Sequence, residues 1–298
     1  MIEGTAAIAW RGVSKRYGAV QALDDLGLEI APGEVFGFLG PNGAGKSTAI
    51  KIAAGLARPD GGEVLLRGVP AARPESRVGV GYLPEDLRFP KGFRLGEWLR
   101  VQTDLRGADP GRIGRMAERT GLSGRLKDDL AGFSKGMRRR AALTLLLVQD
   151  PEVWLLDEPT ADLDVAGREM VENIVFEARS RGAAFFLSSH ILSEVERVCD
   201  RVGIIGKGRL EKTARPAELL PAPFILDLTF PASPEGAGLF LGGRSYVLSP
   251  EARRVRVFVR DREDGNAVAA DLEAAGHIPA ESLFRPASLR DALGEVRT

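Results

Sequence analysis

A glycine-rich segment that ends in lysine and serine constrains the fold of this chain more than any other feature. The segment comprises Gly40, Pro41, Asn42, Gly43, Ala44, Gly45, Lys46 and Ser47. In such a pattern the glycines let backbone N–H groups surround phosphate oxygens, the lysine adds a positive charge, and the serine hydroxyl is a ligand for Mg²⁺. An apolar stretch at 33–39 precedes it, and a helix is predicted to begin at Thr48, which we also expect to bind the nucleotide. The positive end of that helix would point at the phosphates.

These features predict a site for a nucleoside triphosphate and Mg²⁺ at a strand-to-helix turn. The alternative is a glycine-rich turn that matches the pattern by chance, and the flanking strand and helix disfavour it. The loop alone does not indicate which nucleotide-driven machine contains it.

A pair of acidic residues follows a second apolar strand. Residues 153–156 read Val-Trp-Leu-Leu, and Asp157 and Glu158 come next. Asp157 is predicted to hold Mg²⁺ through water, and Glu158 to orient and polarise an attacking water. The alternative is a strand that leads into an exposed acidic turn.

His190 ends a third apolar segment, which begins at Phe185. At a strand end the ring could hydrogen-bond the γ-phosphate or the attacking water, a role that only the family resemblance described below favours. The alternative is a structural histidine, which is the more common role of a lone histidine.

Strands and helices alternate through the first two thirds of the chain. Strands are expected at 6–10, 27–30, 33–39, 63–67, 77–83, 153–156 and 184–188, and helices at 48–54, 95–105, 111–120, 135–149 and 164–181. This order predicts an α/β fold around a mostly parallel sheet, with a mainly helical subdomain at about 85–150.

Three prolines between 215 and 223 mark a predicted domain boundary. Residues 1–215 would form the nucleotide-binding domain, and residues 216–298 a small C-terminal α/β domain. In the second domain strands are expected at 224–230 and 255–259, with Val255, Val257 and Val259 on one face, and a helix at 267–275.

Composition narrows the classes of protein to consider. Lys and Arg total 41, as do Asp and Glu, and the absence of net charge argues against a nucleic-acid partner. The single cysteine, Cys199, excludes an internal disulfide and fits a reducing compartment. No signal peptide is visible, and no apolar run approaches the roughly 20 residues of a membrane span.

Residues 133–137, Phe-Ser-Lys-Gly-Met, precede a predicted helix. Together with the phosphate loop and the carboxylate pair, this segment resembles the ABC ATPase family. Ser134 and Gly136 match the family's commonest signature, whereas Lys135 and Met137 replace glycine and glutamine. The resemblance implies that this helix end binds the γ-phosphate held by a second subunit, in a head-to-tail dimer. Alone, the segment would be an ordinary helix N-terminus.

The resemblance covers residues 8–215 and includes three weaker matches. Tyr17 resembles the aromatic residue that stacks on adenine, with an ordinary surface tyrosine as the alternative. Glu85 stands where most members have a glutamine that contacts Mg²⁺ and senses the membrane partner, so contact of Glu85 with the metal stays open. Asp162 and Asp164 resemble the loop that links the two sites of the dimer. The implied fold is a P-loop ABC ATPase domain with an antiparallel β part.

The resemblance implies the ATP-binding and hydrolysing subunit of an ABC transporter, with ATP and Mg²⁺ as cofactors. The Ser-Lys-Gly-Met variant and a segment at 286–291 are similar to ATPases of ABC-2-type export systems, although 286–291 fits a plain amphipathic helix equally well. The implied assembly is an ATPase homodimer on the cytoplasmic face of the membrane, bound to a separate integral-membrane permease. The C-terminal domain could regulate, dimerise or hold that partner.

Two other classes fit less well. ABC ATPases that act on ribosomes are similar to two ATPase domains in tandem, whereas this chain has one. Those that act on DNA carry a long coiled coil between the phosphate loop and the signature, and the 88 residues from Lys46 to Ser134 are too few for one. A P-loop kinase or GTPase is disfavoured by residues 133–137 and by the lack of an Asn-Lys-x-Asp motif.

Overall fold

The computed structural model describes residues 6–233, 241, 243–249 and 253–293. The chain divides into two compact units, Met1–Thr213 and Ala214–Arg297, and the boundary predicted after residue 215 lies two residues from this division. Residues 1–5, where a signal peptide would begin, lie outside the described residues. Residues 294–298, the end of the predicted second domain, lie outside them too.

A six-stranded sheet forms the centre of the first unit, in the order β10-β9-β3-β8-β7-β6. Its strands are β3 (Val35–Leu39), β6 (Val80–Leu83), β7 (Val153–Asp157), β8 (Ala184–Ser188), β9 (Arg201–Gly206) and β10 (Arg209–Ala214). The five strands other than β10 run parallel. Every residue of β3, β7 and β8 is buried, as expected for parallel strands that are covered on both faces. The predicted α/β fold with a mostly parallel sheet is confirmed.

A second sheet has the order β2-β1-β4-β5 and is antiparallel. Its strands are β1 (Ile8–Tyr17), β2 (Val20–Ile30), β4 (Gly61–Leu66) and β5 (Val69–Pro70). The prediction of short strands at 6–10 and 27–30 is wrong in extent, because β1 and β2 form one long hairpin. Register shifts on both sides of Val13 interrupt the period-two pattern that would have indicated it.

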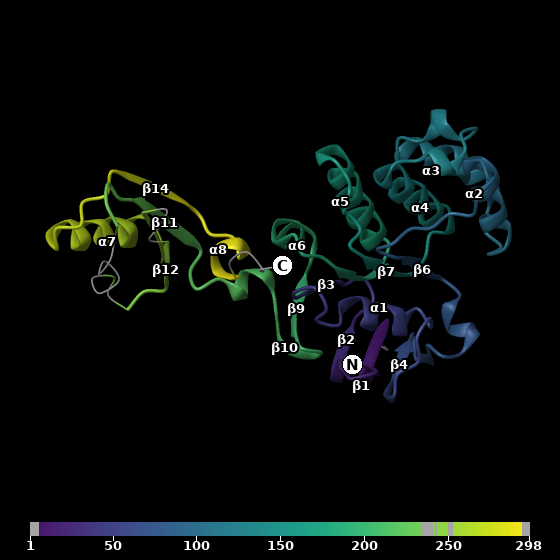
Figure 1. Cartoon of the computed structure of the whole chain (residues 1–298), viewed down its shortest axis with the longest axis horizontal. Helices are drawn as coiled ribbons and strands as arrows, with labels where there is room; N and C mark the ends of the chain where they lie inside the picture. The colour runs from purple at the N-terminus through teal and green to yellow at the C-terminus, as the bar shows by residue number, and fades with distance from the viewer. Residues whose placement is uncertain (1–5, 234–240, 242, 250–252, 294–298) are drawn as a thin grey trace. The chain divides into compact units, whose positions relative to one another are not determined.

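The described part of this unit contains six α-helices: α1 (Lys46–Ala53), α2 (Leu95–Asp104), α3 (Ile113–Arg119), α4 (Lys135–Gln149), α5 (Val165–Ser180) and α6 (Leu192–Val198). Helices α2, α3 and α4 gather beyond the β6 side of the sheet (Figure 1). Short 3₁₀ helices also occur in this unit, namely η1 (Pro74–Arg77), η2 (Pro110–Arg112), η3 (Ser123–Arg125) and η4 (Leu130–Gly132). Among the described residues, no helix combines the length and apolar character that crossing a bilayer requires.

The parallel arrangement brings distant polar residues to one edge of the sheet. Asp157 at the end of β7 lies in register with Ser188 at the end of β8, and Phe38 near the end of β3 pairs with the same serine. Ligands of open α/β sheets bind outside the carboxyl ends of the strands. This edge is therefore where a functional site is expected.

The second unit is built on an antiparallel sheet in the order β12-β13-β11-β14. Its elements are η5 (Pro216–Leu219), β11 (Phe224–Thr229), β12 (Tyr246–Ser249), β13 (Arg254–Val259), α7 (Arg262–Ala274), β14 (Glu281–Pro286) and α8 (Leu289–Leu293). Val255, Val257 and Val259 are fully buried in one cluster with Val268 and Leu272 of α7, which confirms their predicted common face. Helix α7 begins earlier than the predicted 267 because Asp261 caps its N-terminus.

Asp291 ties α8 to β14. Its carboxylate is buried and accepts hydrogen bonds from Arg285 at 2.7 and 2.8 Å, and from the backbone N–H and hydroxyl of Ser288 at 2.9 and 2.8 Å. Burial alone would raise the pKa of Asp291, but the hydrogen bonds from Arg285 and Ser288 outweigh it and lower the pKa to about 2.

We expect Asp291→Asn to lower the free energy of unfolding of the second unit by about 2 kcal/mol at pH 7, the usual contribution of charge-assisted hydrogen bonds. A depressed pKa stabilises the fold above the unfolded value near 4, and this contribution is lost as pH falls towards 2. Hydrogen exchange of the β11 amides at several pH values measures the effect. Asp271→Asn, at an exposed carboxylate of α7, is the control. Equal exchange rates in wild type and Asp291→Asn would contradict the assignment.

Candidate nucleotide site

The loop between β3 and α1 folds as a tight cradle. The Lys46 ammonium group is buried and donates hydrogen bonds to the carbonyl oxygens of Gly40, at 2.6 Å, and Pro41, at 3.2 Å. Gly45 has φ 114°, and a Cβ there would lie 2.3 Å from the carbonyl oxygen of Ala22. No side chain fits at that position, so the close approach of β2 to the loop requires glycine. The lysine thereby lies inside the curve of the loop.

This loop and the carboxylate pair line one cavity of about 280 Å³. The lining residues are Ala22, Asn42, Gly43, Gly45, Lys46, Ser47, Thr48, Glu85, Asp157 and Glu158. Segments that are more than 100 residues apart in the sequence therefore meet here. Gly40, Pro41 and Ala44 belong to the loop but not to the lining, and Ala22 was not predicted, because it belongs to none of the sequence motifs.

The Ser188 hydroxyl holds the carboxylate pair in place. It donates to Asp157 Oδ1 at 2.7 Å and accepts from the backbone N–H of Glu158 at 3.0 Å. Glu158 has φ 50°, a conformation that costs a non-glycine residue about 1–3 kcal/mol and persists where neighbours hold it. Sequence reasoning missed Ser188, although a polar residue at the end of a buried strand was an available signal.

His190 contacts the second carboxylate. Its Nδ1 lies 2.7 Å from Glu158 Oε2, and with a carboxylate acceptor this nitrogen carries the proton. The Glu158 side chain is only 9% exposed, whereas that of His190 is 51% exposed. The exposed ring can thus orient a buried carboxylate and still face the solvent side of the site.

Two buried contacts near the pair were also missed. Arg139 of α4 donates to the carbonyl oxygens of Asp157 and Glu158. The Thr160 hydroxyl donates to Glu194 of α6, and burial raises the pKa of that carboxyl group. Neither contact has a sequence signal, because each joins segments that only the fold brings together.

The residues at 134–137 lie apart from the cavity lining. Ser134 caps α4, with its hydroxyl accepting from the N–H of Met137 at 3.2 Å. A Cβ at Gly136 would lie 2.7 Å from the carbonyl oxygen of Asp162, so the helix start packs closely on that loop. Lys135 lines a neighbouring cavity together with Asp162.

The loop at 162–164 is held from both sides. Asp162 has φ 62°, and Asp164 caps α5 by accepting from the N–H of Gly167 at 2.9 Å. Asp164 also pairs with Arg140 of α4 at 2.9 Å. The bond from Gly167 and the charge of Arg140 lower the pKa of Asp164.

Tyr17 ends β1 and is 49% exposed, with the Lys15 ammonium group 5.3 Å from its ring centroid. It does not line the 280 Å³ cavity. The contact of this ring with adenine therefore stays a prediction.

Comparison with known proteins identifies the family. The sequence profile described as "ABC transporter" matches residues 23–161. An ABC transporter ATP-binding protein of Bacillus subtilis, YhcH, is 39% identical over 207 residues, which is 67% of each chain. A Nod factor export ATP-binding protein I of Cupriavidus metallidurans is 32% identical over 298 residues, which is 96% of each chain.

Solved structures agree with these relatives. An ATP-binding subunit of an ABC transporter superposes with a TM-score of 0.67 at 29% identity, covering 72% of this chain and 91% of that one. A dimeric bacterial ABC transporter cassette has a TM-score of 0.65 at 21% identity, covering 70% and 98%, and shows the shared fold. The chain therefore belongs to the family of ABC transporter ATP-binding proteins and is an ATPase.

Proposed function

We propose that the chain is the motor subunit of an exporter, in which ATP closes a dimer of two such chains and the motion passes to a separate permease. The observation that carries this proposal is the single cavity that unites the phosphate loop with Asp157 and Glu158, while the signature residues 134–137 lie outside it. One chain thus supplies most of an ATP site, and a second copy would complete it.

The cavity suits the triphosphate of Mg²⁺-ATP. Backbone N–H groups of the loop and Lys46 would hold the phosphates, and Tyr17 would stack on adenine. The Ser47 hydroxyl and the Asp157 carboxylate are oxygen donors of the kind Mg²⁺ prefers, and Glu85 lines the same cavity. When bound, the metal ion would neutralise charge on the phosphate oxygens.

Glu158 would orient the water that attacks the γ-phosphate. Its carboxylate is buried beside the loop and is a hydrogen-bond acceptor for a water proton. His190 would fix the rotamer of Glu158 through the 2.7 Å hydrogen bond and present its other ring nitrogen towards the nucleotide. For His190, the contact with the γ-phosphate or the attacking water was predicted from the sequence, whereas the contact with Glu158 was not.

Dimerisation would follow from the position of the signature. Ser134 and Gly136 lie at the N-terminus of α4, an end that attracts anions but does not line the chain's own cavity. A second copy in head-to-tail orientation would offer this end to the γ-phosphate. Asp162 and Asp164, which pack beside the same helix start, would then lie near the shared site and link the two halves.

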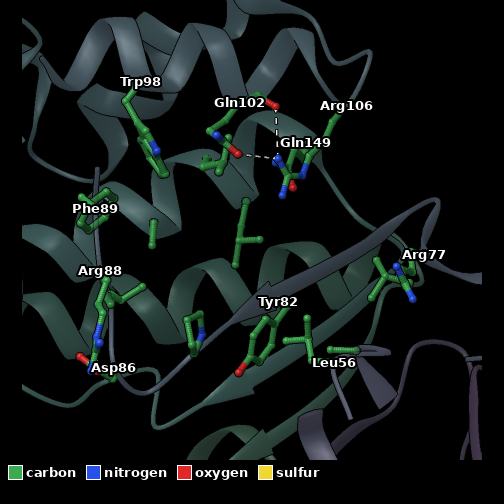
Figure 2. A pocket seen from close by; sticks show the side chains of 17 residues that line it. Leu56, Arg77, Tyr82, Asp86, Arg88, Phe89, Trp98, Gln102, Arg106 and Gln149 are labelled. Carbon is green, nitrogen blue, oxygen red and sulfur yellow. Dashed lines mark hydrogen bonds and ion pairs between the residues drawn. The ribbon is translucent and has the colours of Figure 1, made fainter. Parts of the chain in front are cut away.

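A groove of about 530 Å³ beside the helices suits the permease. Figure 2 shows Phe89 and Trp98 on one side and Tyr82 and Leu56 on another. The rings of Phe89 and Trp98 meet edge to face at 4.8 Å between centroids. Burial and the charges of Asp157 and Glu85 raise the pKa of Tyr82 to about 12, so its hydroxyl stays protonated. The side chains of Leu56, Tyr82, Phe89 and Trp98 form the apolar floor of the groove. This floor would receive apolar side chains of a short helix of the permease.

The rim of the groove is cationic. Arg77 and Arg106 are exposed and form no ion pair within the described part of the chain, whereas Arg88 pairs with Asp86. Arg106 instead donates to the Gln102 side chain at 2.7 Å, as Figure 2 shows. By charge complementarity the docking helix would carry carboxylates beside its apolar residues.

Export and a place on the cytoplasmic face of the membrane are further parts of the proposal. The Nod factor export protein of Cupriavidus metallidurans aligns over 96% of this chain, including the second unit, and this supports export. The chain's zero net charge gives no support for a nucleic-acid partner.

Affinity purification of Glu158→Gln from its own cells, in mild detergent with ATP, tests the partner. We expect a multi-spanning membrane protein in stoichiometric amount by mass spectrometry. Arg77→Glu combined with Arg106→Glu should lose it, because the rim charge is reversed. Arg100→Glu, on an exposed position of α2 outside the groove, is the matched control and should retain it. Recovery of ribosomes or DNA-repair proteins without a permease would contradict the transport proposal.

A further inference from the structure

Arg139 is an almost fully buried arginine in the second turn of α4, only 3% exposed. Its guanidinium group reaches two separate segments. One terminal nitrogen donates to the carbonyl oxygens of Glu158, at 2.7 Å, and Asp157, at 3.3 Å, and the other donates to the carbonyl oxygen of Glu85 at 2.9 Å. A forked donor of this kind fixes both segments at once, which a single ammonium group cannot do.

Both segments line the nucleotide cavity, and one of them also borders the groove. Asp157 and Glu158 line the nucleotide cavity, and so does Glu85. The residues on either side of Glu85, Pro84 and Asp86, line the 530 Å³ groove. Residues 84–86 therefore form a short wall between the nucleotide cavity and the groove. Arg139 links this wall to the turn that carries Glu158 through its hydrogen bonds to both.

The charge of Arg139 is held without a direct counter-ion. It forms no ion pair with any residue that the structure describes, and burial lowers its pKa while Asp162 and Glu158 act in the opposite direction. Its Nε is also buried without a hydrogen-bond partner. Burying an unpaired cation is costly, and the hydrogen bonds to the three carbonyl oxygens offset that cost, so the guanidinium group is stable only while both segments stay in place.

The turn that Arg139 holds is itself unusual. Glu158 keeps φ 50° with its N–H donating to the Ser188 hydroxyl and its carbonyl oxygen accepting from Arg139 and from the N–H of Ala161. A shift of the carbonyl oxygen would change the backbone that positions the carboxylate beside the phosphate loop. The same shift would pull on the carbonyl oxygen of Glu85 through the shared guanidinium group.

We propose that Arg139 is a positioning residue that couples the Glu158 turn to the 84–86 wall, so that ATP in the cavity alters the groove. The proposal rests on the function proposed above for the cavity and the groove. It assigns to Arg139 both the alignment of Glu158 for hydrolysis and the transmission of nucleotide state to the surface where the partner docks.

Hydrogen exchange of the full chain with and without Mg²⁺-ATP tests the coupling directly. In the wild type we expect ATP to slow exchange in two peptides, one at 40–50 and one at 84–89. In Arg139→Gln we expect slowing at 40–50 to persist and slowing at 84–89 to be lost. Arg112→Gln removes another arginine that donates to a backbone carbonyl, that of Leu147, and is the control for general loss of stability.

Steady-state kinetics gives a second readout. For Arg139→Gln we expect kcat to fall about 10- to 100-fold while KM for ATP changes less than about 3-fold, because misalignment of a catalytic group affects the reaction more than binding. Arg139→Lys keeps the charge but lacks the fork, and we expect it to resemble Arg139→Gln. Full rescue by lysine would overturn the proposed role of the fork.

The outcomes separate this proposal from the one on which it rests. Slowing at 84–89 that survives in Arg139→Gln overturns the coupling, and so does a wild type in which ATP slows exchange at 40–50 only. Failure of ATP to protect 40–50 in the wild type contradicts the assignment of the cavity itself.

Discussion

Glu158→Gln should bind ATP normally and lose hydrolysis by roughly 10²- to 10⁴-fold, the usual contribution of positioned acid–base chemistry. The amide keeps the size of the side chain and can still contact His190, so the cavity should retain its shape. It is a much weaker acceptor for a water proton than the carboxylate. Phosphate release under saturating ATP measures the loss, and ATP titration of the same protein measures binding.

Glu118→Gln is the matched control for Glu158→Gln, because Glu118 is an exposed residue of α3 away from the cavity. It should hydrolyse ATP at the wild-type rate. The hydrolysis-deficient protein should also accumulate as a dimer in the presence of ATP, which size-exclusion chromatography detects. Turnover near that of the wild type in Glu158→Gln would remove Glu158 from its proposed role.

Lys46→Ala should weaken ATP binding about 100-fold, because a charge-assisted contact with the phosphates is removed. The ammonium group also holds the carbonyl oxygens of Gly40 and Pro41, so the loop should lose part of its preformed shape. Calorimetric titration in the Glu158→Gln background measures affinity without turnover.

Lys51→Ala, at an exposed lysine of the same helix α1, controls for loss of charge near the loop and should bind ATP as the parent does. Thermal unfolding without nucleotide separates lost affinity from lost folding. If Lys46→Ala binds ATP as tightly as its parent, the assignment of the cradle is wrong.

Local signals predicted much of the ATPase unit. Helix α4 spans 135–149 as predicted, because Ser134 is a strong N-cap and Pro151 follows its end. Strand β8 spans 184–188 as predicted, since a short apolar run between turns is typical of a buried parallel strand. The phosphate loop and the carboxylate pair, each assigned from its own motif to a Mg²⁺-nucleotide site, line one cavity.

Other features depend on tertiary structure. The bond from His190 to Glu158 joins residues 32 positions apart, and the contact from Arg139 to Glu85 joins residues 54 apart. No local pattern encodes either distance. In the second unit, β14 was missed because its residues are partly exposed and lack an alternating apolar face.

The backbone at Glu158 restricts how this position can change during evolution. Its left-handed φ disfavours β-branched residues, and glycine, asparagine and aspartate adopt it most readily. Glycine and asparagine lack a carboxylate, and aspartate is one methylene shorter, so the residues that suit the backbone are poorly suited to reach a water beside the loop. On the role proposed for Glu158, a substitution that relieves the backbone would therefore remove the group that orients the water. If Glu158 has the proposed role, glutamate at this position serves turnover at a cost in backbone conformation.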